Sequence, residues 1–129
     1  MTNLSIIKST YEGKTSEENG RNLAEHAADD ISWTEAEGFP YAGTYTGLPS
    51  VMQNVFSRLG SEWIGYKFTP DGYVTEGDMV VAYGTYNGTY KQTQKSFSAR
   101  VVHLWKLKEG KIIRFEQFVD SQPVNNAMR

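Results

Sequence analysis

Apolar and polar side chains alternate along residues 101–120, on both sides of the pair Glu109-Gly110. Alternation with a period of two is typical of β-strands, because successive side chains point to opposite faces. A short turn-forming pair between two such runs predicts a hairpin. With a two-residue loop, Lys108 pairs with Lys111, and this pairing fixes the register of the whole hairpin.

The predicted register sets His103 opposite Glu116 and Asp120 opposite Ala99. His103 and Asp120 then share a face but lie about 13 Å apart along the strands, at ~3.4 Å per residue. A Ser-His-Asp type relay needs contacts of ~3 Å, so none is expected between them. Both groups can still reach one bound ligand from separate points. A bulge near the turn would shift this register by one residue.

Both faces of the predicted hairpin are substantially apolar. One face carries Val101, His103, Trp105, Leu107, Ile112, Arg114, Glu116, Phe118 and Asp120. The other carries Val102, Leu104, Ile113, Phe115 and Val119. An antiparallel sheet with one solvent-exposed face usually has polar side chains on that face, so two apolar faces indicate that both are covered. We therefore expect helices to cover the first face and a second copy of the chain to cover the outer face, as an isologous homodimer.

Apolar residues spaced three and four apart predict three helices in the first half of the chain. The first covers residues 4–11, and the second begins at Thr15, whose side chain forms a capping box with Glu18. The third covers residues 48–59 and is expected to stop at Gly60. Its apolar face consists of Leu48, Val51, Met52, Val55, Phe56 and Leu59.

Runs rich in β-branched and aromatic residues predict strands at 63–69, 79–90, 97–108 and 111–120. The cluster Pro70-Asp71-Gly72 is typical of a turn that ends the first of them. Ile31–Glu37, which contains Trp33, is a candidate for an earlier strand. Helices followed by a meander of strands predict an α+β fold, with helices on one face of a curved antiparallel sheet.

Composition narrows the function classes. A chain of 129 residues is the size of one domain, so residues 1–129 are expected to fold together. The net charge is −2 and the basic residues are scattered, which disfavours nucleic-acid and membrane partners.

Cysteine is absent, and His26 and His103 lack companion carboxylates at metal-binding spacings. A glycine-rich loop that could bind the phosphates of a nucleotide is also missing. We therefore expect neither a metal nor a cofactor. The amino terminus lacks a signal-peptide pattern, which predicts a soluble cytoplasmic protein.

Three motifs resemble one family. They are WTEAEG at 33–38, GTYTG at 43–47, and His103 and Trp105 followed by GKIIRFEQFVD at 110–120. Their order resembles the SnoaL-like, ketosteroid isomerase-related proteins of the nuclear transport factor 2-like superfamily. The resemblance implies a conical α+β barrel of a strongly bent antiparallel sheet with three N-terminal helices. It also implies a deep apolar pocket at the open end of the cone.

The resemblance implies candidate catalytic residues. Asp120 occupies the last-strand position where SnoaL-like cyclases keep an acid/base carboxylate, and His103 is its candidate assistant. Burial among aromatic walls would raise the pKa of Asp120. The candidate substrate contacts are Trp33, Glu35, Tyr41, Phe56, Trp105 and Phe118. Each residue also has a structural interpretation: Asp120 as a cap at the strand end, His103 as a core histidine paired with Glu116, the tyrosines as core.

Glu35 and Glu37 lie near the position of the aspartate base in ketosteroid isomerases. The local sequence is Glu-Ala-Glu instead, and the isomerase's tyrosine and protonated aspartate pair has no clear counterpart. Steroid isomerisation is therefore not expected. Both glutamates are interpreted as solvated residues of a strand or a pocket rim.

Two functions of different class follow. The first is a cofactor-independent proton-transfer enzyme, an isomerase or aldol-type cyclase, acting on a small hydrophobic carbonyl compound. The second is a non-catalytic module of the same fold that binds a small molecule or only dimerises. A carboxylate in an apolar pocket is costly unless it is used or paired, which favours the enzyme. The volume of the pocket distinguishes a ligand site from a filled, vestigial one, because ligand sites usually exceed ~300 Å³.

Overall fold

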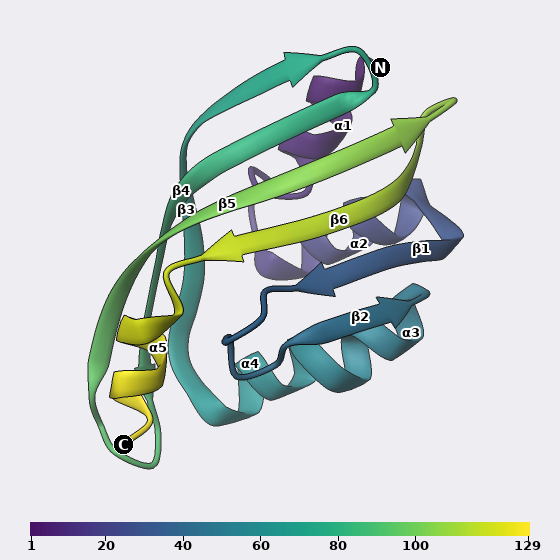
Figure 1. Cartoon of the computed structure of the whole chain (residues 1–129). Helices are drawn as coiled ribbons and strands as arrows, with labels where there is room; N and C mark the ends of the chain where they lie inside the picture. Colours follow the sequence, from purple (N-terminus) through teal and green to yellow (C-terminus); the bar gives the residue numbers. More distant parts are fainter.

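Six strands form one curved sheet in the computed structural model, which describes residues 1–129 (Figure 1). The strands are β1 (Ala27–Glu35), β2 (Gly43–Thr46), β3 (Trp63–Glu76), β4 (Met79–Tyr90), β5 (Ser96–Lys108) and β6 (Lys111–Val119). Their order across the sheet is β2-β1-β6-β5-β4-β3. The prediction of a purely antiparallel sheet was wrong at one place, because β1 and β6 pair in parallel.

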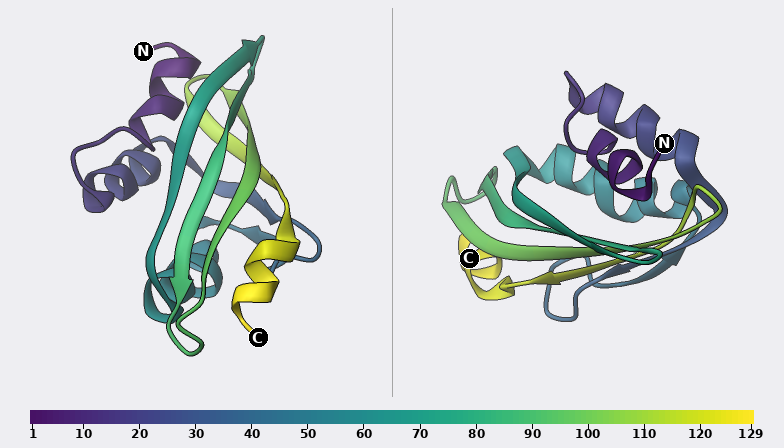
Figure 2. Two further views of the ribbon diagram at one scale, coloured as in Figure 1. Left: turned by 90° about the vertical axis from the view of Figure 1, so that its left-hand side faces the viewer. Right: turned by 90° about the horizontal axis from the view of Figure 1, so that it is seen from above.

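The helices lie on the concave side of the sheet, which confirms the predicted α+β layout (Figure 2). They are α1 (Asn3–Ser9), α2 (Ser16–His26), α3 (Leu48–Val51), a π-helical turn (Met52–Phe56) and α4 (Ser57–Glu62). A further helix, α5 (Ser121–Ala127), follows the last strand and was not predicted. None of these helices has the length and apolar character needed to cross a lipid bilayer.

The predicted cap of the second helix is present in part. The Thr15 hydroxyl accepts a hydrogen bond from the backbone N–H of Glu18 at 3.1 Å. The Glu18 carboxylate accepts from the N–H of Lys14 instead of Thr15, at 2.8 Å. Two of the free N–H groups near this helix start are therefore satisfied, which anchors α2 at its amino end.

The third helix is longer and less regular than predicted. α3, the π turn and α4 run without interruption from Leu48 to Glu62, and Gly60 lies inside α4 instead of ending it. Met52, the first residue of the π turn, lies off the apolar face of the helix and is 52% exposed. Val55 and Phe56, in the same turn, face the sheet and its cavity. Single π turns are frequent at functional sites.

The cluster Pro70-Asp71-Gly72 does not end a strand. It lies within β3, where Pro70 pairs with Gly84 and Gly72 pairs with Tyr83, leaving Asp71 as the extra residue of a bulge. Proline is tolerated here because β3 is an edge strand. A Cβ on Gly84 would lie 2.1 Å from the Thr69 carbonyl oxygen, so only glycine fits opposite this bulge.

The hairpin of β5 and β6 has the predicted two-residue loop, with Lys108 paired to Lys111. Its register then shifts by one, because Ile113 has no partner between the pairs Leu107 to Ile112 and Lys106 to Arg114. His103 is therefore opposite Gln117 and not Glu116. The shift exchanges the two faces of β6 beyond the bulge, so Phe115 and Gln117 point inward and Phe118 points outward.

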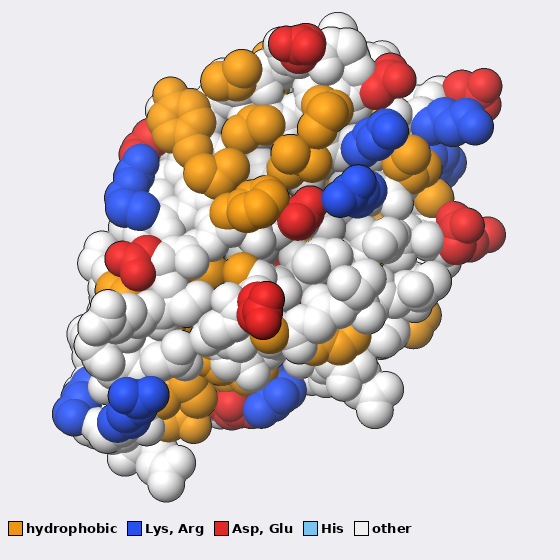
Figure 3. Space-filling model, in the orientation of Figure 1, with side chains coloured by type: hydrophobic (Ala, Val, Ile, Leu, Met, Phe, Trp, Pro, Cys, Tyr) orange, Lys and Arg blue, Asp and Glu red, His pale blue; other side chains and the backbone are white.

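Apolar side chains also cover part of the outer face of the sheet, as predicted. Val74, Val81 and Leu104 lie in one row across β3, β4 and β5, and Tyr83, Val102 and Phe118 lie in another across β4, β5 and β6. Phe118 is 49% exposed and Val74 is 58% exposed. Figure 3 shows the resulting apolar patch on the upper part of this face. We call these six residues the outer apolar patch.

Candidate active site

A cavity of about 210 Å³ lies between the concave face of the sheet and the helices. Trp33, Phe56 and Trp105, which the sequence predicted as walls, all line it. Eleven of its fifteen lining residues are hydrophobic, so each polar group in the wall needs an explanation. The cavity is smaller than the ~300 Å³ usual for ligand sites, but an apolar cavity of about 150 Å³ is known to hold benzene.

Glu35 is the one carboxylate in the cavity wall. It is the last residue of β1 and only 4% exposed, so the prediction of a solvated rim residue was wrong. The indole N–H of Trp33 donates to Glu35 Oε2 at 3.3 Å. Burial raises the pKa of Glu35 to about 8, because the single long hydrogen bond offsets only part of the lost hydration. Glu37, two residues later, is exposed.

His103 lies between two tyrosine hydroxyls inside the cavity. Tyr11 Oη is 2.6 Å from His103 Nδ1, and Tyr86 Oη is 2.6 Å from His103 Nε2. Burial lowers the pKa of His103 to about 3, so the imidazole is neutral near pH 7. Neither nitrogen is free to contact a ligand directly. His103 therefore positions the Tyr11 and Tyr86 hydroxyls at the cavity wall.

Two donors fix the hydrogen bonds around these tyrosines. Trp105 Nε1 donates to the Tyr11 hydroxyl at 2.7 Å. Gln117 Oε1 accepts from the backbone N–H of Ala36 at 3.0 Å, which orients the amide so that Gln117 Nε2 donates to the Tyr86 hydroxyl at 2.9 Å. Each hydroxyl oxygen therefore already accepts one N–H.

A neutral imidazole has one donor and one acceptor nitrogen. His103 accepts the hydroxyl proton of one tyrosine and donates to the oxygen of the other. The tyrosine that accepts from His103 keeps a hydroxyl proton that the network does not use. Tyr11 and Tyr86 both line the cavity, so this proton is available to an oxygen atom of a bound ligand.

Replacing Tyr86 with phenylalanine should lower the free energy of unfolding by roughly 2–6 kcal/mol. The change leaves a ring nitrogen of His103 and the amide of Gln117 buried without this partner, at about 1–3 kcal/mol for each buried polar group. Urea unfolding measures the difference. A loss below about 0.5 kcal/mol would contradict this account, because it would mean that the hydrogen bonds of Tyr86 to His103 and Gln117 do not stabilise the fold.

Three predicted site residues lie away from the cavity. Asp120 is exposed at the start of α5, makes no side-chain cap, and donates only its backbone N–H to Arg100. Phe118 belongs to the outer apolar patch. The placement of both inside the pocket was wrong for the same reason: the unpaired Ile113 reverses the inward and outward positions of β6.

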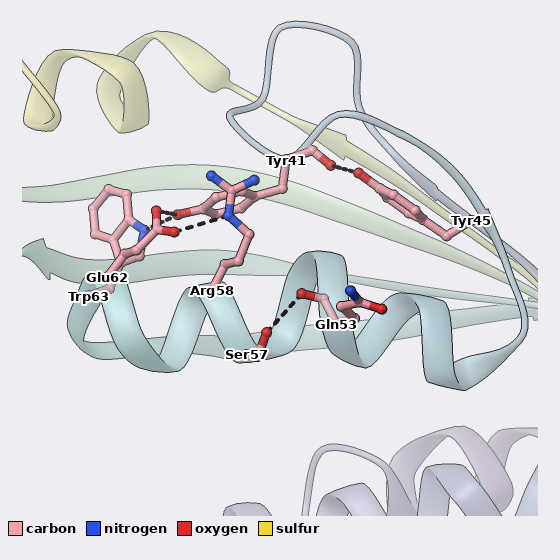
Figure 4. Close-up of polar contacts among 7 residues, drawn as sticks. All are labelled: Tyr41, Tyr45, Gln53, Ser57, Arg58, Glu62 and Trp63. Carbon is pink, nitrogen blue, oxygen red and sulfur yellow. Dashed lines mark hydrogen bonds and ion pairs between the residues drawn. The ribbon is translucent and has the colours of Figure 1, made fainter.

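Tyr41 is buried, but in a polar cluster at the end of α4 and not in the cavity (Figure 4). Its hydroxyl donates to Glu62 Oε1 at 2.7 Å and accepts from Trp63 Nε1 at 2.9 Å. The guanidinium of Arg58 lies 4.4 Å above the ring and pairs with Glu62 at 3.0 Å. Tyr41 therefore fixes the loop after β1 to the helix, which is a structural role.

Sequence reasoning did not place Tyr66, Tyr86 or Gln117 at the site. Glu35 was named as a candidate substrate contact, and the alternation of Ile31, Trp33 and Glu35 on the inward face of β1 is the signal for its burial. No comparable signal marked Gln117, since its inward position depends on the bulge at Ile113.

The sequence model of the SnoaL-like domain family matches residues 11–115 of this chain. A crystal structure of an NTF2-like protein from Burkholderia thailandensis is similar over 100% of this chain and 98% of its own, at 42% identity and a TM-score of 0.94. No curated protein matches the chain.

Two more distant structures share the fold. TerC, co-crystallised with polyporic acid, is 22% identical, covers 98% of this chain and 97% of its own, and has a TM-score of 0.84. A structure labelled as a SnoaL-like polyketide cyclase from Jannaschia sp. CCS1 is 16% identical, covers 97% and 90%, and has a TM-score of 0.80. At these identities the likeness concerns the fold.

Proposed function

The chain belongs to the SnoaL-like domain family, and from that premise we propose that it is a cofactor-independent proton-transfer enzyme. The reaction is an isomerisation or aldol-type cyclisation of a small hydrophobic carbonyl compound held in the cavity. The observation that carries the proposal is Glu35: a carboxyl group buried in an apolar wall, with one long hydrogen bond and a pKa raised to about 8. A group whose pKa lies near the working pH exchanges protons efficiently.

In the proposed reaction the Glu35 carboxylate removes a proton from the carbon next to the substrate carbonyl. The electron pair of the broken C–H bond moves onto the carbonyl oxygen, which gives an enolate and a neutral Glu35 carboxyl. Returning the proton to another carbon completes an isomerisation. Attack of the enolate carbon on a second carbonyl forms the ring in a cyclisation, and the new alkoxide then takes the proton back from the Glu35 carboxyl, which restores the carboxylate.

A hydrogen-bond donor in the same cavity is needed to stabilise the negative charge on the enolate oxygen. The unused hydroxyl proton of Tyr11 or Tyr86 supplies one, and His103 decides through its tautomer which tyrosine carries it. His103 is thus a positioning residue in this proposal. It does not carry a charge itself, because burial holds its pKa near 3.

Related structures support a small ligand. One protein of this fold was crystallised with polyporic acid, and another, with a ketosteroid isomerase-like fold and from Catenulispora acidiphila, is in complex with trimethylamine. The members labelled polyketide cyclases support cyclase or isomerase chemistry in the same way. These ligands and labels belong to those proteins.

Acetophenone tests the proposal because it fits a small apolar cavity and its methyl protons are next to a carbonyl. In deuterium oxide the wild-type protein should accelerate loss of the methyl proton signal, followed by proton NMR. Acceleration proportional to protein concentration supports a proton-transfer enzyme. Saturable binding of acetophenone without exchange would contradict it and support the non-catalytic binding module.

We also propose that the outer apolar patch joins two copies of the chain. Exposed apolar patches mark interaction surfaces, and one patch that meets itself about a two-fold axis gives a closed dimer. Light scattering should then give twice the 14.6 kDa chain mass. Phe118→Asp should give monomers, while Met52→Asp, equally exposed but on a helix, should not. A monomeric wild type would refute the interface.

A further inference from the structure

The Tyr66 hydroxyl is the one buried side-chain polar atom without a hydrogen-bond partner. Most buried hydroxyls in proteins are paired, because an unpaired one costs about 1–3 kcal/mol. Tyr66 lines the cavity beside Tyr86, with ring centroids 5.2 Å apart. Burial raises the pKa of Tyr66, and the nearby Glu35 carboxylate adds to the effect, so the hydroxyl keeps its proton.

A bulge in β3 aims Tyr66 into the cavity. Ile64 pairs with Thr89 and Lys67 pairs with Asn87, so Gly65 and Tyr66 together stand opposite Gly88. Gly65 has φ +64°, the left-handed conformation expected at the first position of such a bulge. Without the extra residue, strict alternation from the buried Trp63 would turn Tyr66 to the outside.

The strand opposite makes room for the redirected ring. A Cβ added to Gly88 would lie 3.3 Å from Tyr66 Cα and 3.2 Å from Phe97. The ring of Tyr66 packs against Trp63 and Phe97, with centroids 5.6 and 5.7 Å apart. The aromatic packing thus fixes the direction of the hydroxyl while leaving it unpaired. Bulges next to functional sites commonly re-aim a side chain in this way.

The volume of the cavity limits what the hydroxyl can meet. A cavity of about 150 Å³ holds one benzene molecule, so 210 Å³ corresponds to roughly eight to ten non-hydrogen atoms at the same packing. One six-membered ring with a short carbonyl substituent is of this size. Three fused rings are well above it.

We propose that the Tyr66 hydroxyl binds the carbonyl oxygen of the substrate and that the substrate is a single-ring carbonyl compound. The inference rests on the proposed function in taking this cavity as the reaction site. A carbonyl oxygen has two lone pairs, so it accepts from Tyr66 and from the unused hydroxyl of Tyr11 or Tyr86 together. Tyr66 is then a substrate-binding residue that selects oxygen-bearing ligands.

Binding of two isosteric probes to two matched variants tests this inference. Acetophenone carries the carbonyl, and α-methylstyrene has a methylene group in its place. Tyr66→Phe removes only the hydroxyl. Tyr90→Phe is the control, because Tyr90 packs on the same Trp63 at 4.8 Å but does not line the cavity. NMR shift titration gives the dissociation constants.

We expect Tyr66→Phe to weaken acetophenone binding about tenfold and to change α-methylstyrene binding less than twofold. Tyr90→Phe should change neither. Thermal melting should show Tyr66→Phe at least as stable as the wild type, because the lost hydroxyl had no partner. Equal weakening of both probes, unchanged acetophenone affinity, or no saturable acetophenone binding to the wild type would each overturn the role of Tyr66.

A larger ketone tests the size of the substrate. 2-Acetylanthracene, with three fused rings, should bind at least tenfold more weakly than acetophenone, and equal or tighter binding would overturn the single-ring assignment. These readouts measure affinity and not turnover. Selective loss in Tyr66→Phe without any deuterium exchange would therefore refute the proposed function and leave the binding role of Tyr66 standing.

Discussion

Replacing Glu35 with glutamine should slow the deuterium exchange of acetophenone by two to four orders of magnitude, the usual contribution of a positioned acid or base. Glutamine keeps the shape of the side chain and can still accept the hydrogen bond from Trp33. It cannot take up the proton of the substrate. Binding of acetophenone should change little, which separates lost chemistry from a lost site.

Glu37→Gln is the matched control, because Glu37 is the same residue type two positions away and is exposed. It should exchange at the wild-type rate. The wild-type rate should rise about tenfold per pH unit and level off above about pH 8, where Glu35 is ionised. An unchanged rate in Glu35→Gln, or an equal loss in both variants, would remove Glu35 from the reaction.

The second large effect concerns stability. The ordinary pKa of this carboxyl is 4.5, and folding raises it to about 8. Between these values the folded protein binds one more proton than the unfolded chain, so the free energy of unfolding falls as pH rises, by about 1.4 kcal/mol per unit. The stabilisation present below pH 4.5 is lost through pH 8, a total of roughly 4–5 kcal/mol.

Glu35→Gln has no proton to lose, so its advantage over the wild type should grow from pH 5 to pH 8 and then stay constant. His103 has the opposite dependence, because its folded pKa is depressed: its contribution is lost as pH falls from 6.5 toward 3. That slope is common to both proteins and cancels in their difference. Urea unfolding at intervals of one pH unit measures the difference. A difference independent of pH would mean that Glu35 titrates as an exposed carboxyl.

Local patterns were sufficient for most of the fold. Helix caps such as Thr15 and the alternation in β5 depend on neighbours in the sequence, and the structure confirms both. The layers also followed in part: three predicted helical segments and most of the predicted strands are present, although β1 and β2 precede the third helix in the chain. The parallel pairing of β1 with β6 joins segments about 80 residues apart and has no local signature.

The site was harder to predict because single bulges decide which side chains enter it. One unpaired residue, Ile113, turns Gln117 inward and Phe118 and Asp120 outward. The bulge at Gly65 brings Tyr66 inward in the same way. Sequence shows the period of a strand but not where a residue is skipped. The contact of Tyr11 with His103 spans 92 positions and requires the folded chain.

Sequence reasoning named Glu35 as a candidate substrate contact, and Glu35 does line the cavity, alternating with Trp33 and Ile31 on the inward face of β1. The same glutamate was also interpreted as a solvated residue of a strand or pocket rim, and charged residues are in general rarely buried without a partner. That general tendency was wrong at this position. Departures of this kind are expected where function competes with stability.

The pKa of Glu35 is the most direct measure of the proposed chemistry. Carboxyl-carbon NMR titration of the wild-type protein, with Glu35→Gln to assign the signal, gives it without a substrate. A midpoint near 8 is the predicted result, because the carboxyl is desolvated in the cavity wall. A midpoint near the ordinary 4.5 would mean that Glu35 is ionised and solvated at neutral pH, and would contradict its role as the proton-transfer group.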